Sequence, residues 1–218
     1  MTAFDDPAYK VAEFLLQIKA VKLQPENPFT WASGWKSPIY CDNRKTLSYP
    51  QIRTYIRHQF IETINKHFAK PEVIAGVATG GIAMGALIAN EMNLPFVYVR
   101  SEAKKHGLTN MIEGEIQSGQ SVVVIEDLIS TGGSSLKAVE ALREMGCNVK
   151  GMAAIFTYGF AEAEQNFKKA KCNLKTLSNY DILIQKALQK EYITEKDVES
   201  LKQWRLNPAE WKGTLIKK

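Results

Sequence analysis

Residues 122–134 read VVVIEDLISTGGS, and their pattern indicates the fold class. The run from Ser121 to Ile125 is rich in β-branched residues and has no polar alternation, which predicts a strand buried on both faces. Two acids, Glu126 and Asp127, end this strand, and a turn of small residues then leads into a helical pattern. A doubly buried strand that leads into a helix through a tight turn is typical of a parallel α/β sheet.

Apolar runs of the same kind lie on both sides of this stretch. Helical patterns at 82–92 and 134–145 separate them, and Gly146 follows the second pattern, where a left-handed helix cap is expected. This alternation predicts a central parallel sheet flanked by helices, with right-handed crossovers between the strands. The further strands are expected at 73–77, 96–99 and 149–157.

The two ends of the chain carry helical patterns of their own. Near the N-terminus, helices are expected at 7–21 and 48–68, the second opened by a capping box of Ser48 and Gln51. These elements would form an appendage to the sheet. Towards the C-terminus the expected elements are a helix past Phe160, a short strand at 174–177 and a final helix that opens at Thr194.

Composition bounds the class of protein. The chain has 218 residues, of which 45% are hydrophobic and 23% charged, the balance of an ordinary globular protein. A chain of this length can bury about 70% of the surface that its unfolded form exposes, so one domain without disulfides is expected. No linker, repeat or low-complexity segment divides it.

Targeting signals and charge narrow the expected partners. The N-terminal segment is acidic and lacks an apolar signal core, and three cysteines without C-x-x-C spacing fit a reducing compartment, so we expect a cytoplasmic protein. The uncharged stretch at 73–89 contains four glycines and indicates soluble elements rather than a membrane span. The net charge is +5, and Lys168, Lys169 and Lys171 favour a solvated helix face. Neither a membrane nor a nucleic acid is expected as a partner.

The turn after the two acids has the composition of a phosphate cradle. Glycines let backbone N–H groups approach an anion, hydroxyls add donors, and the dipole of the following helix favours negative charge. The acids would repel a bare phosphate, so they serve another part of the ligand, either vicinal sugar hydroxyls or a hydrated Mg²⁺. The alternative, a helix cap without a ligand, would leave two adjacent acids buried without partners, which is costly. The expected phosphosugar site comprises Glu126, Asp127, Leu128, Ile129, Ser130, Thr131, Gly132, Gly133 and Ser134.

The strand, the acid pair and the Ser/Thr-Gly turn resemble the 5-phosphoribosyl 1-pyrophosphate (PRPP) signature of the type I phosphoribosyltransferases. Neither G-x-x-x-x-G-K-[ST] nor G-x-G-x-x-G occurs, which argues against the other common nucleotide-binding folds. From about Phe29 to Tyr158, further segments match the orotate phosphoribosyltransferases of that family in order. The resemblance implies that residues 130–134 hold the 5-phosphate, and that Glu126 and Asp127 bracket the ribose 2- and 3-hydroxyls.

A second loop, ATGGI at 78–82, follows the first expected parallel strand. The resemblance implies that Thr79 and Gly80 face the pyrophosphate through backbone amides, because Gly80 stands where other members carry a lysine. A plain tight turn is the alternative for this segment.

A third, polar connection follows the strand at 96–99, and its length is typical of a lid. It resembles the flexible catalytic loop of the family, in which an arginine, a lysine and a histidine contact pyrophosphate. Arg100, Lys104 and His106 fit those roles, and Lys105 is assigned to substrate binding beside them. A charged surface loop without a catalytic role is the alternative.

A fourth segment, FTWASGWKSPIYCDNR at 29–44, alternates aromatic and small polar residues and resembles the hood segment that covers the base. Tyr40 offers a flat face on which a pyrimidine can stack. Lys36 is expected to replace a lysine that relatives carry where this chain has Ala32. A purely structural aromatic cluster is the alternative.

The resemblance implies an anchor for the carboxylate of orotate, and a substitute for it is expected because Tyr158 stands where some relatives have an arginine. Arg44 is the expected substitute. A surface arginine beside Asp42 is the alternative for this residue.

The resemblance implies one phosphoribosyltransferase domain over residues 1–218, with a core at about 70–160, a small hood that includes 22–46, and a C-terminal extension at 160–218. It implies transfer of phosphoribose from PRPP to orotate, giving orotidine 5′-phosphate and pyrophosphate in pyrimidine biosynthesis. Mg²⁺ is the implied cofactor, with no residue assigned as its ligand, and the implied assembly is a homodimer that shares the catalytic loop. The alternatives are a purine-base phosphoribosyltransferase and a non-catalytic PRPP-sensing regulator, the latter disfavoured by the Lys/His loop.

Overall fold

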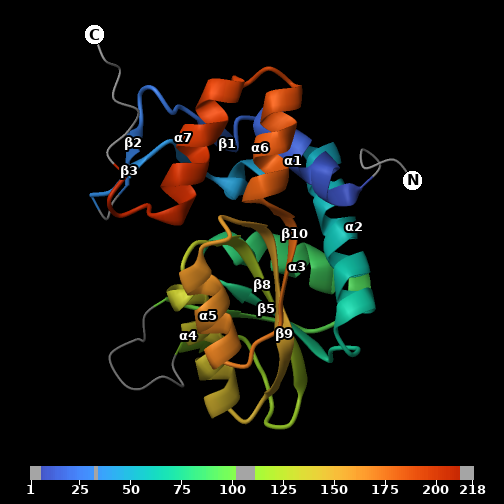
Figure 1. The fold of residues 1–218 in the computed structure, drawn as a ribbon. Coiled ribbons are helices and arrows are strands. Elements are labelled where there is room, and N and C mark those ends of the chain that lie inside the picture. Colours follow the sequence, from blue (N-terminus) through green and yellow to red (C-terminus); the bar gives the residue numbers. More distant parts are fainter. Residues whose placement is uncertain (1–5, 32–33, 102–110, 212–218) are drawn as a thin grey trace.

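A six-stranded sheet forms the centre of the protein (Figure 1). The computed structural model describes residues 6–31, 34–101 and 111–211. Five strands are parallel, and the edge strand β7 runs antiparallel to β6, which confirms the α/β class expected from the sequence. In spatial order the strands are β10 (Leu174–Asn179), β9 (Asn148–Thr157), β8 (Ser121–Ile129), β5 (Val73–Val77), β6 (Phe96–Val99) and β7 (Ile112–Glu113).

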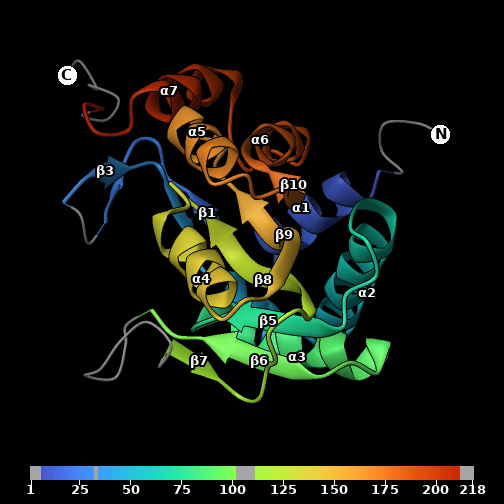
Figure 2. The same ribbon diagram turned by 90° about the horizontal axis from the view of Figure 1, so that it is seen from below.

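Helices cover both faces of this sheet (Figure 2). Successive residues of β8 enter opposite cores: Val123 packs in the core under one pair of helices, and Val122 and Val124 pack in the other core. Because both faces are buried, the strands need no polar alternation, which is why apolar runs identified them. The helices are α2 (Pro50–His67) and α3 (Gly80–Met92) on the first face, and α4 (Gly133–Glu144) and α5 (Ala161–Lys169) on the second.

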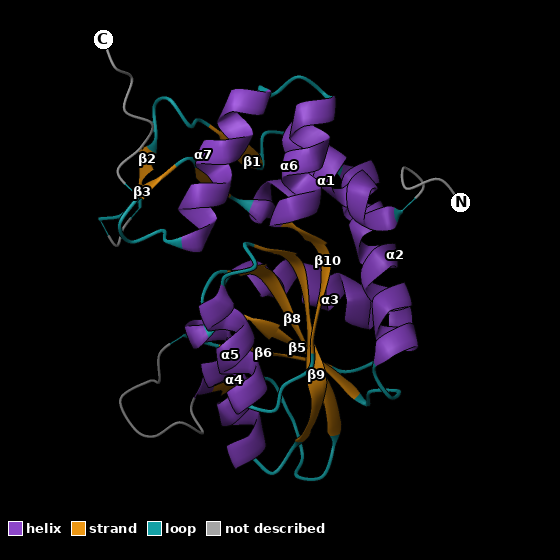
Figure 3. Cartoon of the chain, viewed as in Figure 1, coloured by secondary structure: helices purple, strands orange, loops and turns teal. Residues whose placement is uncertain are grey.

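The two ends of the chain form a small hood on the side of the sheet where β10 ends (Figure 3). Trp204 is fully buried there, and its ring packs on Trp31, Tyr158, Phe160 and Tyr180 with centroid distances of 5.4–5.7 Å. These aromatic contacts join the hood to the end of β9. The hood contains α1 (Pro7–Gln17), the antiparallel pair β1 (Val21–Leu23) and β4 (Ile39–Cys41), the hairpin of β2 (Phe29–Thr30) and β3 (Lys36–Ser37), α6 (Tyr180–Gln189) and α7 (Glu195–Leu206).

The N-terminal helices differ from the expectation at their ends. α1 stops at Gln17 rather than near residue 21, because Lys19 adopts a positive φ of 54° and Val21 pairs in β1. The capping box of Ser48 and Gln51 is wrong: α2 begins at Pro50, its N-cap is Tyr49, and no side chain caps it. Ser48 instead ends a short 3-10 helix, η2 (Asn43–Ser48).

The C-terminal part contains one helix that the sequence pattern does not predict. α6 follows β10 without a loop, and the Asn179 side chain caps it by accepting a hydrogen bond from Ile182 N at 3.0 Å. The last helix opens at Thr194 as expected, with Asp197 completing a capping box. None of the helices in the described ranges is both long and apolar enough to cross a bilayer.

Candidate active site

A cavity of about 350 Å³ opens where two neighbouring parallel strands, β5 and β8, end. The chain leaves β5 through α3 towards β6, and leaves β8 through α4 towards β9, in opposite directions across the sheet. Ligands of open α/β sheets bind in the crevice at such a divergence, beyond the carboxyl ends of the strands. The lining residues are Cys41, Asp42, Arg44, Val77, Ala78, Thr79, Gly80, Glu126, Asp127, Leu128 and Ser134.

The second acid of the pair, Asp127, faces the loop at the end of β5. β8 continues through both acids to Ile129, four residues beyond the predicted strand end, and so carries the Asp127 side chain over the start of α3. The carboxylate lies against the Cα of Gly80, the first residue of α3, and leaves no room for a side chain there. The peptide bond between Ala78 and Thr79 in the same loop is cis. The structure thus brings Thr79, Gly80 and Asp127 together at one helix N-terminus, which favours anions.

The first acid, Glu126, lies deeper than Asp127 and is only 6% exposed. Its Oε1 accepts a hydrogen bond from the Asp127 backbone N–H at 2.9 Å, and its Oε2 accepts one from the Ser135 hydroxyl at 2.8 Å. Burial, together with the neighbouring Asp127 charge, raises the pKa of Glu126 to about 8. A carboxyl group in this state is mostly protonated near neutral pH, and it can donate a hydrogen bond as well as accept one.

Ser135 was not among the residues expected in the site. It is the third residue of α4, it is 2% exposed, and its hydroxyl reaches back to Glu126 across nine positions of sequence. The available signal was a hydroxyl in the first turn of the helix that follows a buried acid, since such an acid needs a donor.

The turn at 130–134 forms the N-terminus of α4. Gly132 is the N-cap with φ of 83°, a conformation that favours glycine, and a Cβ there would lie 2.6 Å from the Phe167 ring. The Asn166 side chain of α5 donates to the Thr131 carbonyl at 3.0 Å and so fixes the turn to α5. Gly133 and Ser134 are exposed at the helix start, which is the arrangement for binding a phosphate.

Ile129 differs from its neighbours in the expected phosphosugar segment. Its side chain is fully buried in the core under α4 and α5, and its carbonyl accepts from Tyr158 N at 3.2 Å. The side chain therefore supports the end of β8, while Leu128 lines the cavity.

Two hood residues approach the cavity in different ways. Arg44 lines it and pairs with Asp42, with 2.7 Å between Nε and Oδ1, and this contact raises the pKa of the guanidinium. Tyr40, whose side chain is 41% exposed, packs on Phe29 with 5.6 Å between the ring centroids and is not among the lining residues.

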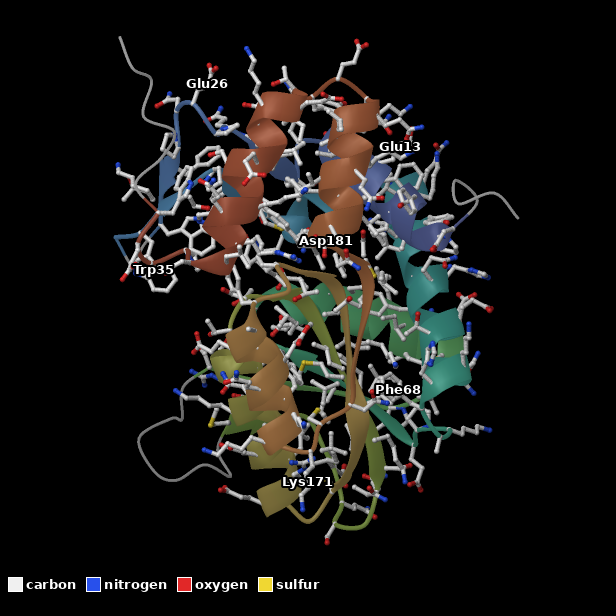
Figure 4. The ribbon with its side chains drawn as sticks, viewed as in Figure 1. Glu13, Glu26, Trp35, Phe68, Lys171 and Asp181 are labelled. Atoms are coloured by element: carbon white, nitrogen blue, oxygen red, sulfur yellow. The ribbon has the colours of Figure 1, made fainter. Side chains whose placement is uncertain are left out.

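Lys36 lies away from the acids. Its Nζ donates to the Thr30 hydroxyl at 2.8 Å across the β2–β3 hairpin, and it lines a separate cavity of about 870 Å³ with Trp35 and Trp211. Figure 4 shows Trp35 at the end of the hairpin in the hood, far from Phe68 in the sheet lobe.

The third loop is described only at its two ends. Arg100 follows β6 and pairs with Glu113 of β7, with 3.3 Å between Nη1 and Oε1. Lys104, Lys105 and His106 lie outside the described residues. Arg100 is at the same edge of the sheet as the cavity, because Ala78 N donates to the carbonyl of Val99 at 2.8 Å.

Tyr158 does not open into the cavity. It is 3% exposed and packs against Trp31 and Phe156, with ring centroids 5.4 and 5.8 Å away, and this burial raises the pKa of its hydroxyl well above the ordinary value. The aromatic residue at this position serves packing between hood and sheet.

Sequence comparison matches the chain to a known protein family. A family model described as "Phosphoribosyl transferase domain" matches residues 47–190. A curated relative from Phocaeicola vulgatus, named orotate phosphoribosyltransferase, is 62% identical over 202 residues, which cover 93% of this chain and 95% of the relative.

Solved structures show the same fold. The crystal structure of orotate phosphoribosyltransferase from Aeropyrum pernix matches with a TM-score of 0.72 at 28% identity, covering 84% of this chain and 98% of that one. Leishmania donovani UMP synthase matches with a TM-score of 0.76 at 30% identity, covering 92% of this chain and 43% of that longer one.

Proposed function

The chain belongs to the phosphoribosyltransferase family, among its orotate phosphoribosyltransferases, and from this membership we propose that it transfers phosphoribose from PRPP to orotate. The products are orotidine 5′-phosphate and pyrophosphate, a step of pyrimidine biosynthesis. Relatives at about 60% identity carry the orotate name, which favours orotate over a purine base and a catalyst over a PRPP-sensing regulator.

The observation that carries the proposal is the convergence of two helix N-termini on one acid pair. α4 offers Gly133 and Ser134 for a 5-phosphate, and α3 offers Thr79 and Gly80 for a pyrophosphate. Asp127 lies between these two sites at the cavity wall, where ribose hydroxyls would be held. A sugar with phosphate groups at both ends matches this set of donors and acceptors around one cavity.

In the proposed reaction, N1 of orotate bonds to C1 of the ribose as the bond from C1 to the pyrophosphate oxygen breaks. The electron pair leaves with pyrophosphate, so negative charge grows beside the start of α3. Backbone amides at Thr79 and Gly80 would stabilise that charge, together with Arg100, Lys104 and His106. The proton on orotate N1 leaves as the N1–C1 bond forms, and the departing pyrophosphate can accept it, so no strong general base of the protein is needed.

We propose Mg²⁺ as the cofactor because the donor set suits a hard cation held mainly by substrate. Carboxylate and hydroxyl oxygens of Asp127, Thr79 and Ser134 line the cavity. Within the described ranges no cluster of three or more His, Cys, Asp or Glu side chains forms a dedicated cage, and Mg²⁺ characteristically binds through substrate phosphates and one or two carboxylates. When bound, the ion would neutralise charge on the diphosphate.

We propose a homodimer in the cytoplasm as the working form. The three cysteines of the chain are free thiols, which fits a reducing compartment. The two strands on either side of the segment that carries Lys104, β6 and β7, form one edge of the sheet, and a loop shared with a second subunit is proposed at this edge. Mixing Lys104→Ala chains with Asp127→Asn chains tests this: hybrid dimers with a shared loop contain one intact site and regain activity. No recovery after subunit exchange has been demonstrated would contradict a shared loop.

The experiment that tests the function is turnover of PRPP with Mg²⁺ and orotate, measured beside adenine and hypoxanthine by release of pyrophosphate. We expect release with orotate and none above background with the purines. Asp127→Asn serves as the control that the observed turnover belongs to this site. Turnover of either purine at a comparable rate would overturn the assignment of orotate.

A further inference from the structure

A buried amide connects the hood directly to the acid pair. Asn43 is the first residue of η2 and is 1% exposed, and its Nδ2 donates to the main-chain carbonyl of Asp127 at 2.6 Å. The two residues are 84 positions apart, so this bond ties the segment that would cover the base to the strand that would hold the ribose.

The orientation of this amide is determined by its partners. A carbonyl oxygen only accepts, so the NH₂ group of Asn43 faces Asp127 and its Oδ1 faces the other way. The main-chain carbonyl of Asn43 separately accepts from the Thr46 hydroxyl at 2.7 Å. The side-chain Oδ1 accepts from the thiol of Cys41 at 3.2 Å, so both ends of the amide are hydrogen-bonded. A side chain fixed at both ends transmits a displacement of the hood rather than absorbing it.

β5 does not pair with Asp127, so it cannot replace the hydrogen bond from Asn43. Pairing of β5 with β8 ends at Gly76 opposite Ile125, two residues before Asp127. Beyond that point η2 of the hood lies beside β8, joined to it by the bond from Asn43 to Asp127. The β9 ladder holds β8 on the opposite side, at Glu126 and Leu128, so Asn43 is the contact that fixes the Asp127 main chain, and with it the carboxylate over Gly80, from the hood side.

We propose that Asn43 is a positioning residue for the ribose site: it aligns Asp127 for PRPP and couples that alignment to the seating of the hood over the base. The proposal rests on the proposed function, in which Asp127 contacts the ribose. Asn43 is not among the residues that line the cavity, so it acts on the substrates through the carbonyl of Asp127.

The test is a double-mutant cycle of Asn43→Ala with Asp127→Asn. The readouts are kcat/KM for PRPP and the dissociation constant of Mg²⁺-PRPP measured by calorimetry. We expect Asn43→Ala to lower kcat/KM at least about fivefold in the wild-type background, and less than about twofold when residue 127 is already asparagine, because coupled residues are not additive. Equal losses in both backgrounds would show a merely structural role and overturn the proposal.

Thr46→Val is the matched control. It removes an equally buried hydrogen bond in the same turn without touching the bond to Asp127. We expect it to lower the melting temperature about as much as Asn43→Ala, while kcat/KM stays within about twofold of wild type. An equal loss of kcat/KM in the control would also overturn the proposal.

Asn43→Asp provides a second variant in case the alanine variant does not fold. An ionised carboxylate cannot donate to the Asp127 carbonyl, but a protonated carboxyl can. Its deficit in kcat/KM relative to wild type should therefore shrink as the pH falls from about 7.5 to about 5.5. A deficit independent of pH would contradict the donor role.

If wild type fails to turn over orotate, the proposed function fails, and the calorimetric cycle still decides whether Asn43 positions Asp127 for PRPP.

Discussion

The carboxylate of Asp127 and the Cα of Gly80 are in direct contact, so that a Cβ at position 80 would fall 2.2 Å from Asp127 Cγ. Glycine at this position is what allows the acid to lie over the start of α3. The contact also shows what occupies the space beside residue 80 in a chain that has no lysine there: the Asp127 carboxylate lies against the backbone at the start of α3.

Gly80→Ala should therefore displace the Asp127 side chain. A carboxylate can rotate away at a cost of about 0.5–1.5 kcal/mol, so the free energy of unfolding should fall only by that amount. kcat/KM should fall at least about tenfold, because the ribose contact is lost. Denaturant unfolding and kinetics measure the two effects. Gly133→Ala is the control for stability, since its nearest contact would be 4.0 Å away. Unchanged kcat/KM in Gly80→Ala would contradict this account.

Asp127→Asn tests the ribose contact itself. The substitution keeps the size of the side chain but removes its charge, and a charge-assisted hydrogen bond to a ribose hydroxyl is worth about 1.5–3 kcal/mol. We expect at least a tenfold loss of kcat/KM, about 1.4 kcal/mol, measured in steady state with orotate and PRPP. Wild-type kinetics in this variant would remove Asp127 from the site.

Glu126→Gln tests the pKa of the buried acid. Because the folded-state pKa of Glu126 is raised from 4.5 to about 8, the unfolded chain loses this proton at lower pH than the folded chain. The contribution of Glu126 to the free energy of unfolding therefore falls as the pH rises through this window, by up to about 1.4 kcal/mol per pH unit. A glutamine can accept from Asp127 N and donate to the Ser135 hydroxyl without titrating.

The variant should consequently gain stability relative to wild type between about pH 5 and about pH 8.5. Denaturant unfolding of both proteins across this range measures the difference. A difference that does not change with pH would show that Glu126 is already ionised in the folded protein at the lower pH.

The sequence predicted the sheet well because its strands are buried on both faces, so that Val122 to Ile125 needed no polar alternation to be recognised. The predicted end of β8 at Ile125 was wrong, because the strand continues through Glu126 and Asp127 and pairs there with β9. A strand that continues through two acids, one buried and one at the cavity wall, has no local sequence signal.

The site could be predicted only where it is contiguous. The turn at 130–134 and the acids before it are adjacent in sequence, whereas Asn43 meets Asp127 across 84 positions. Lys36 was predicted to contact the substrates because relatives carry a lysine at the position of Ala32. The register of the β2–β3 hairpin instead pairs Lys36 with Thr30, away from the acids. Such pairings are set by tertiary packing rather than by local pattern.

Lys104→Ala tests the role assigned to the third loop. A lysine that stabilises the departing pyrophosphate acts more on the transition state than on the ground state. kcat should fall by about 10² or more, while the dissociation constant of PRPP changes little, as for other preorganised charge stabilisers. Single-turnover kinetics and calorimetry separate the two quantities. A large loss of affinity with normal kcat would contradict the assignment.

Arg44→Ala tests the anchor for the orotate carboxylate. A carboxylate that enters a closed site without a partner costs several kcal/mol, and Tyr158 is buried among aromatic rings, so it provides no cation. Arg44 lines the cavity, and its bond to Asp42 uses Nε. Among the residues that the structure describes, its two terminal NH₂ groups have no further partner, and together they match a carboxylate in geometry.

The measurement compares orotate with uracil, which lacks the carboxylate, in wild type and in Arg44→Ala. If Arg44 is the anchor, kcat/KM for orotate should fall at least about tenfold, and kcat/KM for uracil by less than about twofold. Asp42→Asn is the matched control, because it removes the charge paired with Arg44 but leaves the guanidinium at the cavity wall. Equal losses for both bases in Arg44→Ala would mean that the arginine serves the hood through its pair with Asp42, and that backbone amides near Ser130 hold the carboxylate instead.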